Sequence, residues 1–306
     1  MTEKIYKPIT ITPNFYQLGT PSFPAYLSMG EEGMIIEGGT GATFNIMVKQ
    51  IDALGIDPKR IKYIALTHTH ADHIGAVPHI KIIWPHLKVL AGSVAAKSLA
   101  NGKMIKEFLW LDQSIAEIMK SKDEIDELPP TLEKYDFGVG TIVEEGDKID
   151  LGSGIEWIVY HVPGHSPCHI SLFEEKEGTL VIGDTTGFYV PEKDVFWPNY
   201  FDSLERYCQS IRKLATLPAK RGVLSHNCVI EGEVARHLQK ALKATETYHH
   251  ELLERLNNGE DPDKIALEKA QWVRSLTDIQ PFGVMQSLCK LLIKRSQKDA
   301  EKENLF

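Results

Sequence analysis

Four side chains that can bind a metal ion lie within six consecutive residues of this chain. They are His68, His70, Asp72 and His73, in the sequence His-Thr-His-Ala-Asp-His. In an extended backbone the side chains at positions i and i+2 point the same way, so His68 and His70 are expected to reach one point in space. Asp72 and His73 follow where the chain turns, and are expected to reach a second point nearby. The spacing therefore indicates a site for two adjacent cations.

The ligand types narrow the choice of metal. Imidazole together with carboxylate suits zinc, iron or manganese better than magnesium or calcium, which prefer shells made of oxygen alone. Because the same ligands accept all three transition metals, the sequence predicts two divalent transition-metal ions and leaves their identity open.

Three further residues of ligand type follow apolar stretches later in the chain. His165 comes after a predicted strand at 155–159, Asp184 ends a run at 179–182, and His226 follows a short run at 222–225. A sheet holds the backbone rigid at its strand ends, as a preorganised metal site requires. We therefore expect these three residues to complete the site.

This ordered set resembles the metallo-β-lactamase superfamily, whose members share the His-x-His-x-Asp-His motif, a later Gly-His, a Gly-Asp after an apolar strand and a last His. The match runs from about residue 15 to residue 230. The resemblance implies that a hydroxide shared by the two metals is the nucleophile, since two cations lower the pKa of bound water. It implies these ligands: His68, His70 and His165 for one metal, Asp72, His73 and His226 for the second, and Asp184 as the bridge.

The same resemblance gives Asp72 a second, catalytic role, in which it orients the attacking water. His161 and His169 flank His165, and either support of the ligands or a plain polar loop would account for them. The other histidines are expected to be surface or helix residues: His79, His86, His237, His249 and His250.

Several residues distinguish branches of the family. Asp184 stands where many zinc β-lactamases have a cysteine, and His70 stands where flavodiiron proteins have a glutamate. The short span from His165 to Asp184 has no room for the insertion of the nucleic-acid-processing members. The remaining pattern resembles the glyoxalase II-like and PqsE-like branches, with one departure: His226 lies between Ser225 and Asn227, where the family more often has Gly-His-Gly.

The resemblance implies a dinuclear metallohydrolase that cleaves an ester, thioester or phosphodiester of a small substrate. Aromatic residues in the segments expected to wall the pocket favour an apolar or aromatic substrate: Trp110, Phe188, Tyr189, Phe196, Trp197, Trp272 and Phe282. Two alternatives stay open. One is a mononuclear-iron dioxygenase of the same fold, and the other is a PqsE-like regulatory protein that acts through a binding partner.

The elements that must position these residues alternate between strands and helices. The first half is predicted to hold strands at 15–18, 25–28, 34–36, 61–67 and 88–91 and helices at 43–54 and 75–84. The second half has strand signals from 141 to 190, a helical stripe at 204–214 and a strand at 222–225. The order predicts an α/β fold, an αββα sandwich of two sheets with helices outside. We expect a catalytic domain at 1–230, with a helical insertion at about 102–134, and a helical C-terminal region at 231–306 that covers the site.

Composition excludes several classes of partner. The chain has 306 residues, a net charge of −8 and 42% hydrophobic residues, and its lysines and arginines form no stripe, which argues against nucleic acid. No apolar run is long enough to span a bilayer, and the N-terminus lacks an export signal. Four scattered cysteines form no disulfide framework. We therefore expect a cytoplasmic protein with a small-molecule substrate and no membrane contact, and leave a homodimer open.

Overall fold

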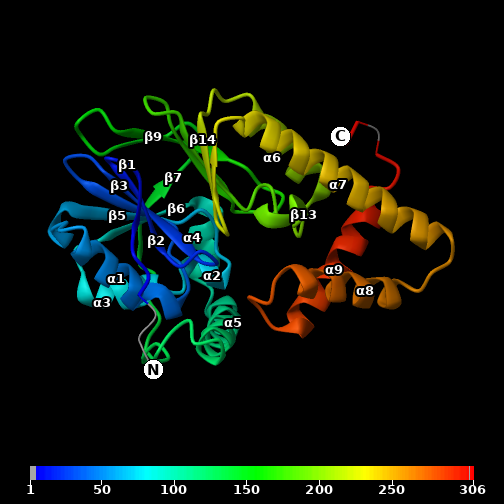
Figure 1. Ribbon diagram of the computed structural model, residues 1–306, viewed down its shortest axis with the longest axis horizontal. Helices are drawn as coiled ribbons and strands as arrows, with labels where there is room; N and C mark the ends of the chain where they lie inside the picture. Colours follow the sequence, from blue (N-terminus) through cyan, green and yellow to red (C-terminus); the bar gives the residue numbers. More distant parts are fainter. Residues whose placement is uncertain (1–4, 303) are drawn as a thin grey trace. The chain divides into compact units, whose positions relative to one another are not determined.

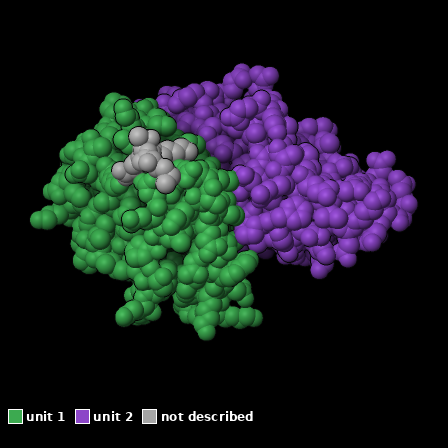
Figure 2. Space-filling view, turned by 60° about the horizontal axis from the view of Figure 1, so that its bottom comes forward, with its two compact units in different colours: residues 1–160 green, residues 161–306 purple. Residues whose placement is uncertain are grey.

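The structure, a computed structural model, describes residues 5–302 and 304–306 and forms two compact units, one up to Tyr160 and one from His161 onward (Figure 2). The domain boundary predicted near residue 230 stays a prediction, because compactness alone does not test it. Residues 1–4, part of the segment in which we expected no export signal, lie outside the described residues.

The N-terminal unit is built on a seven-stranded sheet. Strands β1 to β4 run antiparallel to their neighbours, and β4 to β7 are parallel. Every residue of β3 and β4 is buried, as the apolar runs in the sequence predict. The strands, in the order in which they pair, are β1 (Ile9–Thr12), β2 (Phe15–Gly19), β3 (Pro24–Met29), β4 (Gly33–Ile36), β5 (Ile61–Ala65), β6 (Lys88–Gly92) and β7 (Val139–Val143).

Helices flank this sheet. Figure 1 shows α1 and α3 side by side against the strands, and α1 packs on β2 with Met47 and Ile51 buried. The helices are α1 (Phe44–Ala53), α2 (Ala71–Ile74), α3 (Val77–Ile83), α4 (Ser93–Leu99) and α5 (Gly102–Ser121), with short 3-10 turns at Gly41–Thr43 and Pro58–Arg60.

Two predicted helices differ from those observed. The helix expected at 75–84 is α3, which is shorter, and a separate short helix, α2, precedes it and begins inside the metal-binding motif at Ala71. The insertion expected to be helical over 102–134 is helical only to Ser121, because Asp123 has a left-handed φ of 54° that ends the helix. An acidic stretch and two prolines follow, and neither continues a helix.

A hairpin of β8 (Lys148–Asp150) and β9 (Glu156–His161) lies on the other face of the sheet. Trp157 of β9 is 1% exposed, and its ring lies 5.5 Å from that of Phe15 on β2. Its indole Nε1 donates a hydrogen bond of 2.9 Å to the Ser28 hydroxyl on β3. Trp157 therefore joins strands on the two sides of the apolar layer.

The C-terminal unit repeats this plan. Its strands pair in the order β15-β14-β11-β10, with β11 and β14 parallel and the outer pairs antiparallel. Helix α6 (Leu204–Ala215) begins at Ser203, whose hydroxyl caps Arg206 N, and buries Leu204, Tyr207 and Ile211. The strands are β10 (Ile170–Glu174), β11 (Thr179–Gly183), β14 (Arg221–Leu224) and β15 (Val229–Glu231), with a separate hairpin of β12 (Phe188–Val190) and β13 (Val195–Trp197) beside a 3-10 turn at Pro191–Lys193.

Three helices end the chain, as the helical periodicity predicts. They are α7 (Val234–Asn257), α8 (Pro262–Leu276) and α9 (Phe282–Lys298). Helix α7 packs along α6 and against β13, and α8 packs on α9 (Figure 1). Among residues 5–302 and 304–306, no helix is long and apolar enough to cross a membrane.

Five histidines outside the motifs were expected to be surface or helix residues. His86 and His250 are exposed, but His79, His237 and His249 lie on buried helix faces. All three lie in helices, as expected, and their burial reflects which helix face packs, a tertiary property that the sequence pattern did not predict. Burial lowers the pKa of all three imidazoles to about 4, so they are neutral near pH 7. The four cysteines are free thiols, three of them buried and Cys228 half-buried.

Replacing Trp157 with phenylalanine should lower the free energy of unfolding by about 1–2 kcal/mol, because the buried Ser28 hydroxyl loses its partner. Urea unfolding followed by circular dichroism measures the change. Trp110→Phe is the matched control, since Trp110 is 59% exposed and should change stability by less than about 0.5 kcal/mol. Equal losses in the two variants would contradict the role given to Trp157.

Candidate metal centre

The metal-binding motif lies where β5 leads into α2. His68 is fully buried and His70, the N-cap of α2, is half-buried. His68 Nε2 lies 3.0 Å from His70 Nδ1, with the two rings nearly perpendicular. Two ring nitrogens bound tetrahedrally to one zinc ion lie about 3.3 Å apart, so the observed pair suits a shared cation. The convergence predicted from the i, i+2 spacing is observed.

The other two residues of the motif lie in the first turn of α2. Asp72 Oδ2 is 3.4 Å from His73 Nε2, and the rings of His68 and His73 are 4.2 Å apart. Asp72 keeps 19% of its side chain exposed, whereas His73 is buried. All four ligand-type residues of the motif therefore lie in one cluster.

Glu37 is a buried residue of this cluster that the sequence analysis missed. It follows β4 with a left-handed φ of 72° and is 0% exposed. Its Oε2 lies 3.0 Å from His73 Nδ1, and its Oε1 accepts a hydrogen bond of 2.8 Å from the Thr67 hydroxyl. The only signal in the sequence is a charged residue directly after the fully apolar β4.

These contacts assign the protons of two histidines of the motif. The carboxylate of Glu37 only accepts, so His73 Nδ1 carries the proton and Nε2 has the lone pair. The Thr67 hydroxyl donates to Glu37 and therefore accepts from His68 Nδ1, 3.0 Å away, which again leaves Nε2 with the lone pair. Both Nε2 atoms are thereby prepared to bind a cation, as second partners of ligand histidines commonly arrange.

The insertion helix α5 carries a buried carboxylate beneath the motif. Asp112 is 5% exposed, and its Oδ1 accepts a hydrogen bond of 2.9 Å from Gly41 N. Burial raises the pKa of the Asp112 carboxyl to about 6, hydrogen bonds from Gly41 and Thr40 oppose the shift, and the negative charge of Asp72 adds to it. Helix α5 packs on both α2 and the turn that contains Gly41, so it helps to hold the motif in place.

The C-terminal unit places Asp184 between two imidazoles. Asp184 Oδ2 is 3.3 Å from His165 Nε2, and Oδ1 is 3.8 Å from His226 Nε2. All three side chains are buried. His165 Nδ1 lies 3.0 Å from the carbonyl oxygen of Asn199, which can only accept, so Nε2 of His165 has the lone pair. The three downstream residues predicted from strand ends therefore lie together.

The glycines before His165 and Asp184 are required by close packing. Gly164 has a φ of 133°, and a Cβ there would lie 2.2 Å from Tyr207 N at the start of α6. Gly183 has a φ of 61°, and a Cβ there would lie 2.6 Å from the His169 ring. Glycine is therefore required before both His165 and Asp184, because only glycine allows the backbone positions that place these two side chains.

His169 and His161 have different surroundings. His169 is buried, and its Nε2 accepts a hydrogen bond of 3.1 Å from Asp184 N, so it holds the Asp184 turn. His161 is half-buried, and its carbonyl oxygen accepts from Lys213 Nζ. The supporting role suggested for both residues stays a prediction.

Asn227, the departure from the usual Gly-His-Gly, occupies the conformation that glycine favours. Its φ is 69°, a left-handed region that asparagine tolerates better than most residues. Its Nδ2 donates a hydrogen bond of 2.8 Å to the carbonyl oxygen of Tyr189 on β12. The substitution therefore keeps the turn after His226 and ties it to the β12–β13 hairpin.

Aromatic side chains predicted to wall the pocket are distributed unevenly. Phe188 lies 5.3 Å from the His226 ring, and Phe201, which the sequence analysis did not select, lies 5.4 Å from the His165 ring. Trp197 is 1% exposed and belongs to the core. Trp110 of the insertion helix α5 is exposed to solvent, so the prediction that this residue lines a pocket is not supported.

Replacing Glu37 with glutamine should weaken zinc binding by roughly 10–100-fold, the usual effect of removing a carboxylate behind a ligand histidine. Competition with a chromophoric chelator measures the affinity. Glu32→Gln is the control, because Glu32 accepts from the Tyr63 hydroxyl and touches no ligand. An unchanged affinity in Glu37→Gln would contradict the role assigned to this carboxylate.

Asn227→Gly should cost less stability than Asn227→Ala. Both variants lose the hydrogen bond to Tyr189, but alanine also meets a left-handed φ that costs about 1–2 kcal/mol. Thermal unfolding of the two variants gives the comparison. If alanine proves as stable as glycine, the left-handed turn does not constrain this position.

The metallo-beta-lactamase superfamily model matches residues 26–226, so the chain belongs to that superfamily. The predicted fold class is confirmed: an αββα sandwich, with the helical insertion α5 and a helical C-terminal extension.

Among individual proteins, the chain is 27% identical to a probable metallo-hydrolase of Bacillus subtilis, YflN, over 72% of this chain and 82% of that protein. It is 25% identical to the atrochrysone carboxyl ACP thioesterase of Aspergillus fumigatus, over 80% of this chain and 60% of that protein. The structure also aligns with that of TTHA1429, a metallo-beta-lactamase family protein from Thermus thermophilus. The alignment includes 94% of this chain and 95% of TTHA1429, with a TM-score of 0.63 and 19% sequence identity.

Proposed function

We propose that this protein is a dinuclear metal-dependent hydrolase that cleaves an ester, thioester or phosphodiester of a small, apolar or aromatic substrate. The observation that carries the proposal is the pair of buried half-sites, each with imidazole nitrogens and a carboxylate held by supporting hydrogen bonds. Membership of the superfamily supports the joining of the two half-sites in one centre.

Within that centre, Asp184 is the proposed bridge between two metal ions. Its two oxygens face different histidines, Oδ2 toward His165 and Oδ1 toward His226, as a bridging carboxylate requires. The proposed ligands are His68, His70 and His165 for one ion and Asp72, His73 and His226 for the other.

When bound, two ions of zinc, iron or manganese would lower the pKa of a water molecule toward neutrality and polarise the oxygen of the bond to be cleaved. The chain's own contribution is orientation. Glu37 and Thr67 hold His73 and His68 in the tautomers with Nε2 unprotonated. Asp72 keeps part of its carboxylate exposed, so it is the group proposed to orient the attacking water.

The choice among ester, thioester and phosphodiester rests on similarity to one known protein. The Aspergillus thioesterase aligns with 80% of this chain, which favours a thioester among the three bonds. Buried Phe188 beside His226 supports an apolar group near the reacting bond.

Metal analysis of protein purified without chelator should find about two transition-metal ions per chain. Asp184→Ala should lose at least one of them, because the bridging carboxylate is gone. Asp202→Asn, which removes a carboxylate charge paired with Arg206, is the control and should keep both. Less than one tightly bound ion in the unmodified protein would refute the proposal.

A panel of acyl and aryl thioesters, lactones and phosphodiesters, assayed with each metal in turn, should show thioester hydrolysis that Asp184→Ala abolishes. One iron per chain with oxygen consumed in the presence of a thiol substrate would instead favour the dioxygenase. Cellular function retained by an inactive His70→Ala variant would favour a regulatory protein that acts through a partner.

A further inference from the structure

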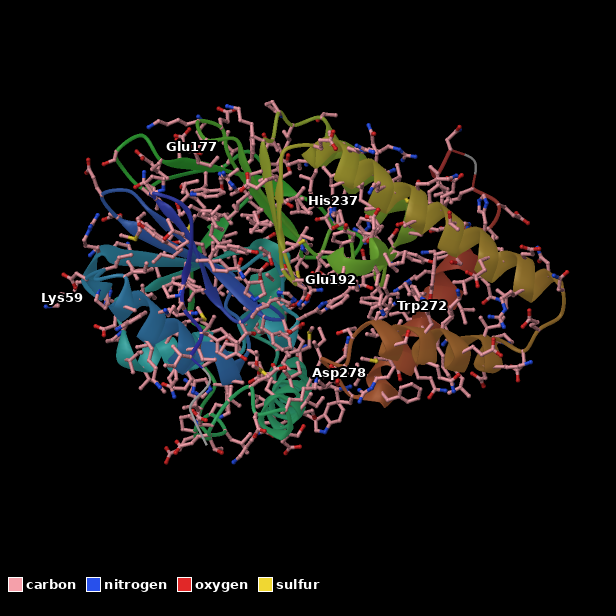
Figure 3. The ribbon with its side chains drawn as sticks, in the orientation of Figure 1. Lys59, Glu177, Glu192, His237, Trp272 and Asp278 are labelled. Carbon is pink, nitrogen blue, oxygen red and sulfur yellow. The ribbon has the colours of Figure 1, made fainter. Side chains whose placement is uncertain are left out.

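A cavity of about 510 Å³ lies within the C-terminal unit, among α7, α8 and the β12–β13 hairpin. Its apolar wall is aromatic: Phe196 of β13, Tyr248 of α7 and Trp272 of α8, which is labelled in Figure 3. The rings of Tyr248 and Trp272 lie 6.1 Å apart. A cavity of this size and lining suits a compact organic molecule with a flat apolar body.

One buried lysine gives this cavity a charged group. Lys269 is 9% exposed, and its Nζ lies 4.7 Å from the ring centre of Tyr248 and 5.6 Å from that of Trp272. Nζ donates a hydrogen bond of 2.6 Å to Glu251, whose side chain is 46% exposed. A buried ammonium group needs an anionic partner. Glu251, the partner of Lys269, is half exposed to solvent, so an anionic ligand could replace it.

The other two lysines that line the cavity have carboxylate partners of their own. Lys240 pairs with Asp194 at 2.6 Å and Lys243 with Glu246 at 2.7 Å. The side chains of Lys240 and Lys243 are largely exposed, whereas Lys269 is buried. Lys269 is therefore the group in this cavity that would recognise an anionic ligand.

The cavity is connected to the His226 half-site through the hairpin. The Phe196 ring lies 4.4 Å from that of Tyr189, and the Tyr189 carbonyl oxygen accepts from Asn227, the residue after His226. On the same strand as Tyr189, the Phe188 ring lies 5.3 Å from that of His226 itself, tilted by 40°. One ring contact and one hydrogen bond therefore link Phe196 to Asn227, the residue next to the proposed metal ligand His226.

We propose that this cavity binds an organic carboxylate with an aromatic body, whose carboxylate takes the place of Glu251 on Lys269 and whose rings lie on Trp272. In the proposed hydrolase this group would be the part of the substrate that is recognised away from the cleaved bond. That second step rests on the proposed function, whereas binding itself does not.

Titration of the full-length protein with 2-naphthoate should quench tryptophan fluorescence in a saturable way, and Trp272→Phe should abolish the quench. The neutral analogue 2-naphthamide should bind at least about tenfold more weakly, as should 2-naphthoate to Lys269→Met, because each loses one charge-assisted hydrogen bond. Lys290→Met is the matched control: it removes a lysine paired with Asp263 elsewhere among the C-terminal helices and should leave binding unchanged.

Glu251→Gln keeps the shape of the cavity but removes the competing carboxylate, so it should bind 2-naphthoate several-fold more tightly. This variant decides the matter if Lys269→Met does not fold by circular dichroism. Equal affinity for acid and amide, or unchanged affinity in Glu251→Gln, would overturn the proposal. If the purified protein holds less than one metal ion per chain but still binds 2-naphthoate through Lys269, the proposed hydrolase fails and this binding site stands.

Discussion

The buried carboxylate of Glu37 joins both ends of the metal-binding motif, since Thr67 before it and His73 at its end both bond to this one side chain. The left-handed backbone of Glu37 turns the side chain back over β5, and Glu37 N bonds to the Ala65 carbonyl oxygen. The geometry of four ligand-type residues therefore depends on the pairing of β4 with β5. A buried negative charge also stabilises the positive charge that bound metal ions bring.

In the C-terminal unit, uncharged groups orient the ligand-type side chains. His165 is oriented by the backbone carbonyl of Asn199, and the Asp184 turn is held by the ring of His169. Glycines at 164 and 183 let the backbone approach α6 and His169 closely enough to aim the ligands.

Particular residues show how far sequence reasoning reaches. The convergence of His68 and His70 follows from a period of two in extended backbone, and their nitrogens are 3.0 Å apart. Glu37 was missed because its partners lie 30 and 36 residues away, and nothing local identifies them. His237 was expected to be a surface or helix residue, and it lies on the face of α7 that packs against Tyr189 and Phe196 of the hairpin. The helical periodicity of the surrounding sequence predicted helix α7, but it could not predict that the β12–β13 hairpin covers the face on which His237 lies.

The sequence by itself determined the family, the alternation of strands and helices, and the seven ligand-type residues, because ligand spacing and apolar periodicity are local properties of the chain. Only the tertiary structure decided which carboxylates support the ligands, how Asn227 replaces glycine, and where a lysine-rich aromatic cavity forms. Each of these depends on contacts between segments far apart in the chain. Such contacts are set by the packing of whole strands and helices, which no short motif encodes.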